Sequence, residues 1–155
     1  MRPAWALAMV TNGIPKLATL EKYAKVDANL PSTAHIGYLL RTAPDWAYLD
    51  VLRSEWDGKL VVKGVTDAAD ARACDKAGAD AVWVTNHSGR QFAAGRATLD
   101  FLPEVRAATT LPVIFDSGVR SGTDILRAIA LGADFVMLGK AFHYGMAAFG
   151  AKGAA

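Results

Sequence analysis

The segment WVTNHSGRQF (83–92), which begins at the end of an apolar run at residues 81–84, brings together side chains that can do chemistry. It contains His87 and, three residues later, Arg90. A histidine can accept a proton in catalysis, and an arginine can bind a carboxylate through two parallel hydrogen bonds. The pair therefore suits a substrate with a hydroxyl or acidic C–H group beside a carboxylate. The same two residues are also ordinary in a solvated surface loop, so the pair alone leaves both interpretations open.

Three other apolar runs are also followed by polar or glycine-containing segments. The residues at these ends are Lys63, Asp116, Ser117, Gly118, Val119, Arg120, Gly139 and Lys140. Glycines at strand–helix turns let backbone amides approach an anion, and Arg120 and Lys140 add positive charge near expected helix starts. A single such glycine is usually only part of a turn. Two in succession, each with a nearby cation, favour a phosphate site.

Four strand–helix units are expected to position these residues. The expected strands are 60–62, 81–84, 112–115 and 135–138, and the expected helices begin at Thr66 or Asp67, then cover 98–108 and 123–131 and follow Lys140. Short strands that are apolar on both faces and alternate with helices indicate an α/β fold with a parallel sheet. In such folds the carboxyl ends of the strands meet at one rim, so the polar residues are expected to converge there.

Residues 1–57 form a less regular helical and loop lead-in to the units at 58–150. Prolines and Asn12-Gly13 interrupt it, and short helices are expected over 16–25 and 44–56. The apolar patch near Met1 is too short for a signal peptide, so this start is interpreted as interior sequence. The four tryptophans are expected to pack in the core or at interfaces.

Composition excludes several classes of function. The 155 residues are 52% hydrophobic and 21% charged, which suits one globular domain, and the net charge of +2 without a basic stripe argues against a nucleic-acid partner. Cys74 is the only cysteine, so neither an intrachain disulfide nor a thiolate metal cluster can form. His35 and His143 lack metal-ligand spacing, and no metal site is expected. No apolar run is long enough to span a bilayer.

Four segments closely resemble the FMN-dependent 2-hydroxy-acid dehydrogenase and oxidase family, which includes lactate dehydrogenases, glycolate oxidases and mandelate dehydrogenases. They are LVVKGV (60–65), VTNHSGRQ (84–91), DSGVRSGTD (116–124) and ALGADFVMLGKAF (130–142), in the family's order and spacing. The resemblance covers about 44–150, and the word RPAW at 2–5 also resembles a family segment that precedes the fifth strand. It implies a TIM (β/α)8 barrel, of which this chain supplies about four C-terminal strand–helix units, because a complete barrel needs about 250 residues.

The resemblance also implies a role for each site residue. Lys63 would lie near flavin N1 and the C2 carbonyl, and Thr85 would contact the isoalloxazine ring. His87 would be the general base, and Arg90 would bind the substrate carboxylate. Asp116 would bind the ribityl chain. The FMN phosphate would be held by Ser117, Gly118, Val119, Arg120, Gly139 and Lys140.

The sequence departs from the family pattern at several positions. Ser88 replaces the more usual glycine, and Phe92-Ala93-Ala94 replaces a Leu-Asp-Gly-like stretch. Lys140 stands where arginine is common, which keeps the charge but loses the bidentate fork. The first half of the family barrel, which normally contributes two active-site tyrosines, a second arginine and the aspartate that orients the base histidine, has no counterpart here.

The resemblance implies FMN-dependent oxidation of a small, lactate-like L-2-hydroxy acid to a 2-oxo acid by a cytoplasmic homo-oligomer. Peripheral contact with a membrane or quinone at the cytoplasmic face stays open, as does the electron acceptor (oxygen, quinone or cytochrome). Alternatively, the chain is a catalytically incomplete half-barrel or an association module. A third alternative, a phosphate-binding barrel of the inosine-monophosphate dehydrogenase type, needs a catalytic cysteine in a glycine- and serine-rich loop. Cys74 instead falls in an expected helix.

Overall fold

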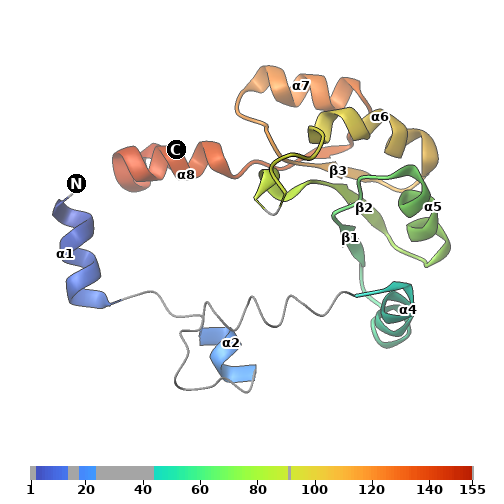
Figure 1. Ribbon diagram of the computed structural model, residues 1–155, viewed down its shortest axis with the longest axis horizontal. Coiled ribbons are helices and arrows are strands. Elements are labelled where there is room, and N and C mark those ends of the chain that lie inside the picture. The colour runs from blue at the N-terminus through green and yellow to red at the C-terminus, as the bar shows by residue number, and fades with distance from the viewer. Residues whose placement is uncertain (1–2, 14–17, 24–43, 91, 155) are drawn as a thin grey trace. The chain divides into compact units, whose positions relative to one another are not determined.

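The computed structural model describes residues 3–13, 18–23, 44–90 and 92–154, and in these the strands form one four-stranded parallel sheet (Figure 1). The strands follow chain order: β1 (Val61–Lys63), β2 (Ala81–Val84), β3 (Val113–Phe115) and β4 (Phe135–Val136). Lys63 pairs in register with Trp83, Trp83 with Ile114, and Ile114 with Phe135. Because side chains alternate between the faces of a sheet, these four residues form one row on one face.

Helices alternate with the strands. They are α4 (Trp46–Glu55) before β1, then α5 (Ala68–Lys76), α6 (Thr98–Ala108), α7 (Gly122–Ala130) and α8 (Lys140–Phe149), with the short 3-10 helices η1 (His87–Gly89) and η2 (Gly150–Ala154). Figure 1 shows α5, α6 and α7 along one side of the sheet. This alternation confirms the expected α/β organisation. β1 extends one residue beyond the expected strand, so Lys63 belongs to the strand itself.

The hydrophobic core lies between the sheet and these helices. Val82 and Val84 of β2 are fully buried, and they pack in one cluster with Leu102 of α6. The other face of the sheet is more open, because Val61 is 41% exposed and Phe135 is 60% exposed. The sheet therefore has a covered face and an open face, and the Lys63–Phe135 row lies on the open one.

The beginning of β1 is fixed by one carboxylate. Asp80 forms ion pairs with Arg53 at 3.2 Å and with Lys59 at 2.7 Å, and it accepts the backbone N–H of Leu60 at 2.9 Å. These interactions, the hydrogen bond from Lys59 foremost, lower the pKa of Asp80 to about 2. The cluster joins α4 to the turn that precedes β2.

Helix α5 begins and packs as the sequence indicates. The side chain of Asp67 caps it by accepting the amide of Ala69 at 2.6 Å, which settles the choice between Thr66 and Asp67. Cys74 lies on its inner side and is fully buried. Burial, together with the nearby carboxylates of Asp70 and Asp75, raises the pKa of the Cys74 thiol to about 11.

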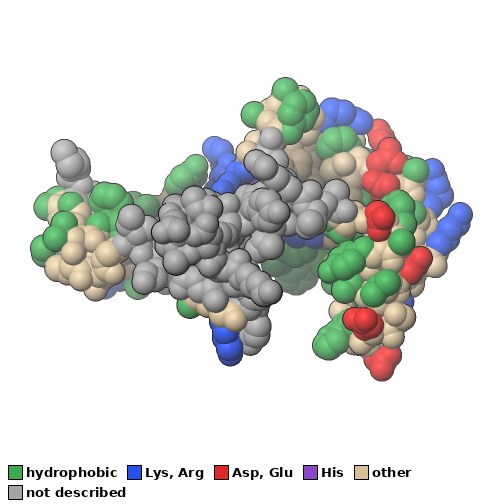
Figure 2. Space-filling model, turned by 60° about the horizontal axis from the view of Figure 1, so that its bottom comes forward, with side chains coloured by type: hydrophobic (Ala, Val, Ile, Leu, Met, Phe, Trp, Pro, Cys, Tyr) green, Lys and Arg blue, Asp and Glu red, His purple; other side chains and the backbone are tan. Residues whose placement is uncertain are grey.

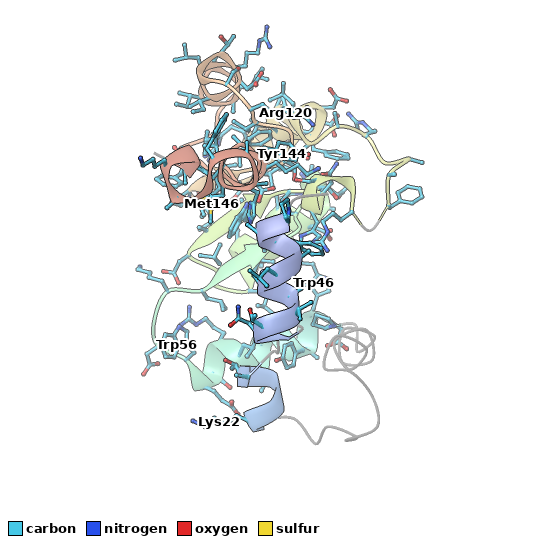
Figure 3. The ribbon with its side chains drawn as sticks, turned by 90° about the vertical axis from the view of Figure 1, so that its left-hand side faces the viewer. Lys22, Trp46, Trp56, Arg120, Tyr144 and Met146 are labelled. Atoms are coloured by element: carbon cyan, nitrogen blue, oxygen red, sulfur yellow. The ribbon has the colours of Figure 1, made fainter. Side chains whose placement is uncertain are left out.

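Of the tryptophans expected in the core or at interfaces, Trp5, Trp46 and Trp56 are 67%, 45% and 57% exposed, so these three do not lie in a core formed by the described residues. The reason is that α1 (Pro3–Asn12) and α4 contain no buried residue. Trp46 begins α4 and Trp56 directly follows it (Figure 3), and hydrophobic side chains stand beside acidic ones on the surface there (Figure 2).

Residues 1–45 and 46–155 are two separate units. The first contains α1 and α2 (Ala18–Tyr23), so the helix expected over 16–25 is described only within α2. His35 and Gln91 lie outside the described residues. Within the described part of the chain, none of the helices has the length and apolar character needed to cross a membrane.

Candidate active site

A cavity of about 560 Å³ opens where the strands end. Lys63 of β1, His87 after β2 and Asp116 after β3 all line it, and this volume is typical of small-molecule sites. The other expected site residues on its wall are Ser117, Gly118, Val119, Arg120, Gly139 and Lys140. The expected convergence of the strand ends is thus present in the structure.

Thr85 and Arg90 are not part of the cavity wall. Thr85 is buried beneath it at 3% exposure, whereas Arg90 is exposed and ends the η1 turn, where its backbone N–H bonds to the carbonyl of His87 at 3.2 Å. Thr85 therefore supports the wall from behind. Arg90 could therefore contact a ligand in the cavity only from outside the cavity wall.

Several wall residues had no expected role in the site. They are Trp83, Asn86, Ser88, Gly89, Ala97, Thr98, Met137 and Leu138. A sequence signal exists for Trp83, because it alternates with Val82 and Val84 and so must face away from the core they form. Trp83 Nε1 and Thr98 Oγ1 are buried, and neither has a hydrogen-bond partner among the described residues.

A carboxylate and two hydroxyls connect the ends of β2 and β3. The hydroxyl of Thr85 donates to Asp116 Oδ1, and the hydroxyl of Ser117 donates to the same oxygen at 2.6 Å. Each hydroxyl oxygen in turn accepts a backbone amide: Thr85 Oγ1 accepts that of His87 at 3.0 Å, and Ser117 Oγ accepts that of Ser88 at 2.9 Å. Asp116 is thus joined through two side chains to the turn that carries His87.

That turn has an unusual backbone. His87, Ser88 and Gly89 have φ angles of 56°, 57° and 69°, so three consecutive residues lie in the left-handed region. Such angles cost little for glycine but are strained for other residues. The Asn86 side chain helps to hold the turn by accepting the amide of Gly89 at 3.2 Å. His87 itself is exposed at the cavity wall.

Lys63 projects over an aromatic ring on the open face of the sheet. Its Nζ lies 5.0 Å from the centroid of the Trp83 ring, within range for a cation–π interaction. Both residues line the cavity. The ring therefore supports a positive charge beside the space where a ligand would lie.

The two glycine-containing turns, at residues 117–120 and 139–140, differ in how well their backbone amides can bind an anion. The carboxylate of Asp124 accepts the backbone amides of Arg120 at 3.2 Å and Ser121 at 3.1 Å, in a capping box at the start of α7. The hydrogen bond from the Ser121 hydroxyl lowers the pKa of Asp124 most, and the two amide bonds lower it further. Helix α8 begins at Lys140, and its N-cap residue Gly139 provides no side-chain cap. The start of α8 is therefore the better anion site of the two.

Lys140 adds charge at that helix start. Its Nζ approaches the carbonyl of Ser88 at 3.5 Å, so the side chain reaches across the cavity mouth toward the His87 turn. His143, one turn further along α8, bonds through Nδ1 to the carbonyl of Gly139 at 2.8 Å. In the part of the chain that the structure describes, no group of three His, Cys, Asp or Glu residues could hold a metal.

Comparison with known proteins gives a consistent result. A family model described as FMN-dependent dehydrogenase matches residues 1–155. The chain is 39% identical to (S)-mandelate dehydrogenase of Pseudomonas putida over 153 residues, which are 99% of this chain and 39% of the relative. It is 39% identical to L-lactate dehydrogenase of Pseudomonas entomophila (strain L48) over 97% of this chain and 41% of that relative.

The solved structures agree with the sequence relatives. A crystal structure of the monotopic membrane protein (S)-mandelate dehydrogenase superposes with a TM-score of 0.84 at 38% identity, covering 98% of this chain and 40% of that one. A soluble mutant of the membrane-associated (S)-mandelate dehydrogenase from Pseudomonas putida gives a TM-score of 0.71 at 37% identity, covering 96% of this chain and 44% of that one. The chain thus spans about two-fifths of the length of these relatives.

Proposed function

The chain belongs to the FMN-dependent dehydrogenase family, and we propose that it forms the C-terminal part of a barrel that oxidises a small L-2-hydroxy acid to a 2-oxo acid. The observation that carries this proposal is the convergence of Lys63, His87 and Asp116 on one cavity wall. These residues come from the ends of three adjacent parallel strands, which is where barrel enzymes of many kinds have their active sites.

The wall residues fit FMN at both ends of the cofactor. The phosphate suits the uncapped start of α8 at Gly139, with the charge of Lys140 beside it. Asp116 offers a carboxylate to the ribityl hydroxyls, and Lys63 places a positive charge where a flavin ring would carry negative charge. When bound, FMN supplies an acceptor for the two electrons that leave the substrate.

The chain's own residues supply the proton chemistry. An imidazole nitrogen of His87 accepts the proton that leaves the substrate, and this role needs the exposed position that His87 has on the cavity wall. Arg90 binds the substrate carboxylate from the outer rim. Mandelate and lactate, the acids named for two relatives, set the substrate class to test first.

The FMN site can be tested on the chain as it stands. Flavin fluorescence, followed while FMN is titrated with purified chain, should show saturable binding. Lys140→Met should weaken that binding about tenfold, because it removes a charge-assisted contact to the phosphate. Lys152→Met is the matched control, since Lys152 is an exposed lysine of η2 that does not line the cavity. Equal affinities of the two variants would contradict the proposed phosphate site.

The catalytic role needs a complete barrel. In a protein that joins this chain to the remaining portion of a relative, His87→Gln should retain FMN and reduce turnover of (S)-mandelate or L-lactate about 10²- to 10⁴-fold. Glutamine keeps much of the bulk but cannot take up the proton. The flavin absorbance per chain gives the occupancy control. Flavin reduction at the parental rate in the variant would refute the role of His87.

We also propose that the complete enzyme contacts the membrane peripherally at its cytoplasmic face. The support is that two structural relatives are described as a monotopic membrane protein and as a mutant of a membrane-associated enzyme. Flotation of the complete protein with lipid vesicles tests this. Protein that stays at the bottom of the gradient at low and high salt would argue against membrane contact.

A further inference from the structure

We propose that Ser117 is a positioning residue, whose hydroxyl holds the turn that carries His87 in its left-handed conformation. This inference deepens the proposed function, since it rests on His87 as the proton acceptor. The hydroxyl group has two defined contacts: it donates to Asp116 Oδ1 at 2.6 Å and accepts the backbone amide of Ser88 at 2.9 Å. Ser88 is the residue directly after His87, so this bond acts on the turn itself.

The carboxylate of Asp116 determines the direction of these hydrogen bonds. An ionised carboxylate accepts hydrogen bonds but cannot donate them, so the hydroxyl hydrogens of both Thr85 and Ser117 point at Asp116. Their oxygens, which lie 3.0 Å apart, are then left as acceptors. The amide of His87 fills one and the amide of Ser88 fills the other. Asp116 thus orients two hydroxyls, and these orient two successive amides of the turn.

The turn needs such support because its backbone is strained. His87 and Ser88 both have a side chain at φ angles of 56° and 57°, where β-carbon crowding makes the conformation costly. At the neighbouring Gly89, no atom of the described residues lies within 4 Å of a β-carbon placed there, so that side of the turn is open in the described structure. Hydrogen bonds from the turn's amides to the side chains of Asn86, Thr85 and Ser117 therefore help to hold the conformation.

Ser117 is itself costly at its position, which strengthens the assignment. Its φ is 80°, a region that glycine enters freely and serine does not. A glycine at 117 would relieve that strain but could make neither hydroxyl contact. The benefit of serine here therefore lies in its hydroxyl, which connects the end of β3 to a turn 29 residues earlier in the chain.

Amide hydrogen exchange on the 155-residue chain without FMN tests the proposal directly. Ser117→Gly removes the hydroxyl and relieves the backbone, whereas Ser117→Ala removes the hydroxyl and keeps the β-carbon. In both variants the Ser88 amide should exchange at least about fivefold faster, the effect expected from losing one net hydrogen bond. The amide of Val82, bonded to the carbonyl of Pro112 at 3.0 Å in the sheet, should exchange at the parental rate.

Ser54→Ala is the matched control, because its hydroxyl bonds within α4, to the carbonyl of Val51 at 2.8 Å, and does not line the cavity. It should leave Ser88 exchange unchanged. Unchanged Ser88 exchange in both Ser117 variants would overturn the proposal. Equal acceleration at Ser88 and Val82 would also overturn it, since Ser117 would then stabilise the whole fold. Neither amide-exchange measurement involves FMN or substrate. The outcome of this test therefore does not depend on the outcome of the FMN titration.

In the complete barrel, Ser117→Gly should lower kcat several-fold and change KM less. The reason is that a mobile His87 affects proton transfer more than substrate capture. A rise in KM alone, with kcat unchanged, would contradict a role in positioning His87.

Discussion

The ammonium group of Lys63 lies 5.0 Å from the ring centroid of Trp83, and the two residues are register partners on adjacent strands. A lysine side chain is long and flexible, so an aromatic ring beneath it restricts where its charge can lie. Since both residues line the same cavity, the ring helps to aim the charge at a bound ligand. Trp83, whose expected role was only packing in the core or at an interface, is thereby part of the cavity wall.

Replacing Trp83 tests this relationship. Trp83→Leu should remove the upfield ring-current shift of the Lys63 ε-CH2 protons in an NMR spectrum and weaken FMN binding about two- to fivefold, in line with a partly exposed cation–π contact. Trp83→Phe is the matched variant, because it keeps a ring face and should retain part of both effects. Identical Lys63 shifts in the parent and both variants would show that the contact does not persist in solution.

Acid should weaken the chain partly through Asp80. Its pKa is about 2 in the fold, below its ordinary value of 3.8, so the folded state holds the ionised form. This stabilisation is present above the unfolded pKa and is lost as pH falls through the folded pKa. The urea midpoint of the parent should therefore fall between about pH 5 and about pH 2. Asp80→Asn should lower the midpoint at neutral pH and flatten that dependence, whereas Asp50→Asn, at an exposed position in α4, should do neither.

The core prediction concerns Leu102 of α6, which is fully buried against the covered face of the sheet. Leu102→Ala should reduce the free energy of unfolding by about 2–5 kcal/mol, because it loses buried area and leaves a cavity. Leu126→Ala on α7, where the leucine is 69% exposed, should change it by no more than about 0.5 kcal/mol. Urea unfolding of the two variants provides the comparison, and similar losses would mean that α6 does not pack as described.

The open face of the sheet predicts that the isolated chain self-associates. Val61 and Phe135 expose apolar area on β1 and β4, whose outer edges pair with no further strand among the described residues, and α8 adds exposed Tyr144 and Met146 (Figure 3). Light scattering should therefore show species larger than one chain. Phe135→Lys should shift the distribution toward monomer, whereas Leu126→Lys, on α7 along the covered side, should not. A parent chain that stays monomeric at high concentration would contradict this expectation.

Periodicity and turn residues were sufficient to predict much of the fold. The apolar runs at 81–84 and 112–115 contain β2 and β3, and Asp67 caps α5 as its residue type favours. Their order along the chain also predicted that the polar strand ends would meet, because parallel strands leave no other arrangement for them. Local sequence carries this information since caps and alternation act over a few residues.

Features that depend on contacts between distant segments were not predictable. The Ser88–Ser117 bond joins two turns that the sequence marks separately as candidate site segments, and nothing in either turn alone indicates that they bond to each other. The unequal anion sites, by contrast, have a local origin: Asp124 turns its carboxylate back onto the amides of Arg120 and Ser121, and the Ser121–Asp124 spacing of this capping box is a signal present in the sequence. Arg90 lies off the cavity wall, directly after the three residues with left-handed φ angles.

The burial of Cys74 makes its thiol a probe of local opening of the fold. It is the only thiol in the sequence, it has no exposed surface, and its pKa of about 11 leaves very little thiolate at neutral pH. A thiol reagent can therefore modify the folded chain only during moments when α5 lifts from the sheet. The rate of labelling therefore reports how often the helix layer behind β1 and β2 opens. A ligand that stabilises the strand ends should lower that labelling rate.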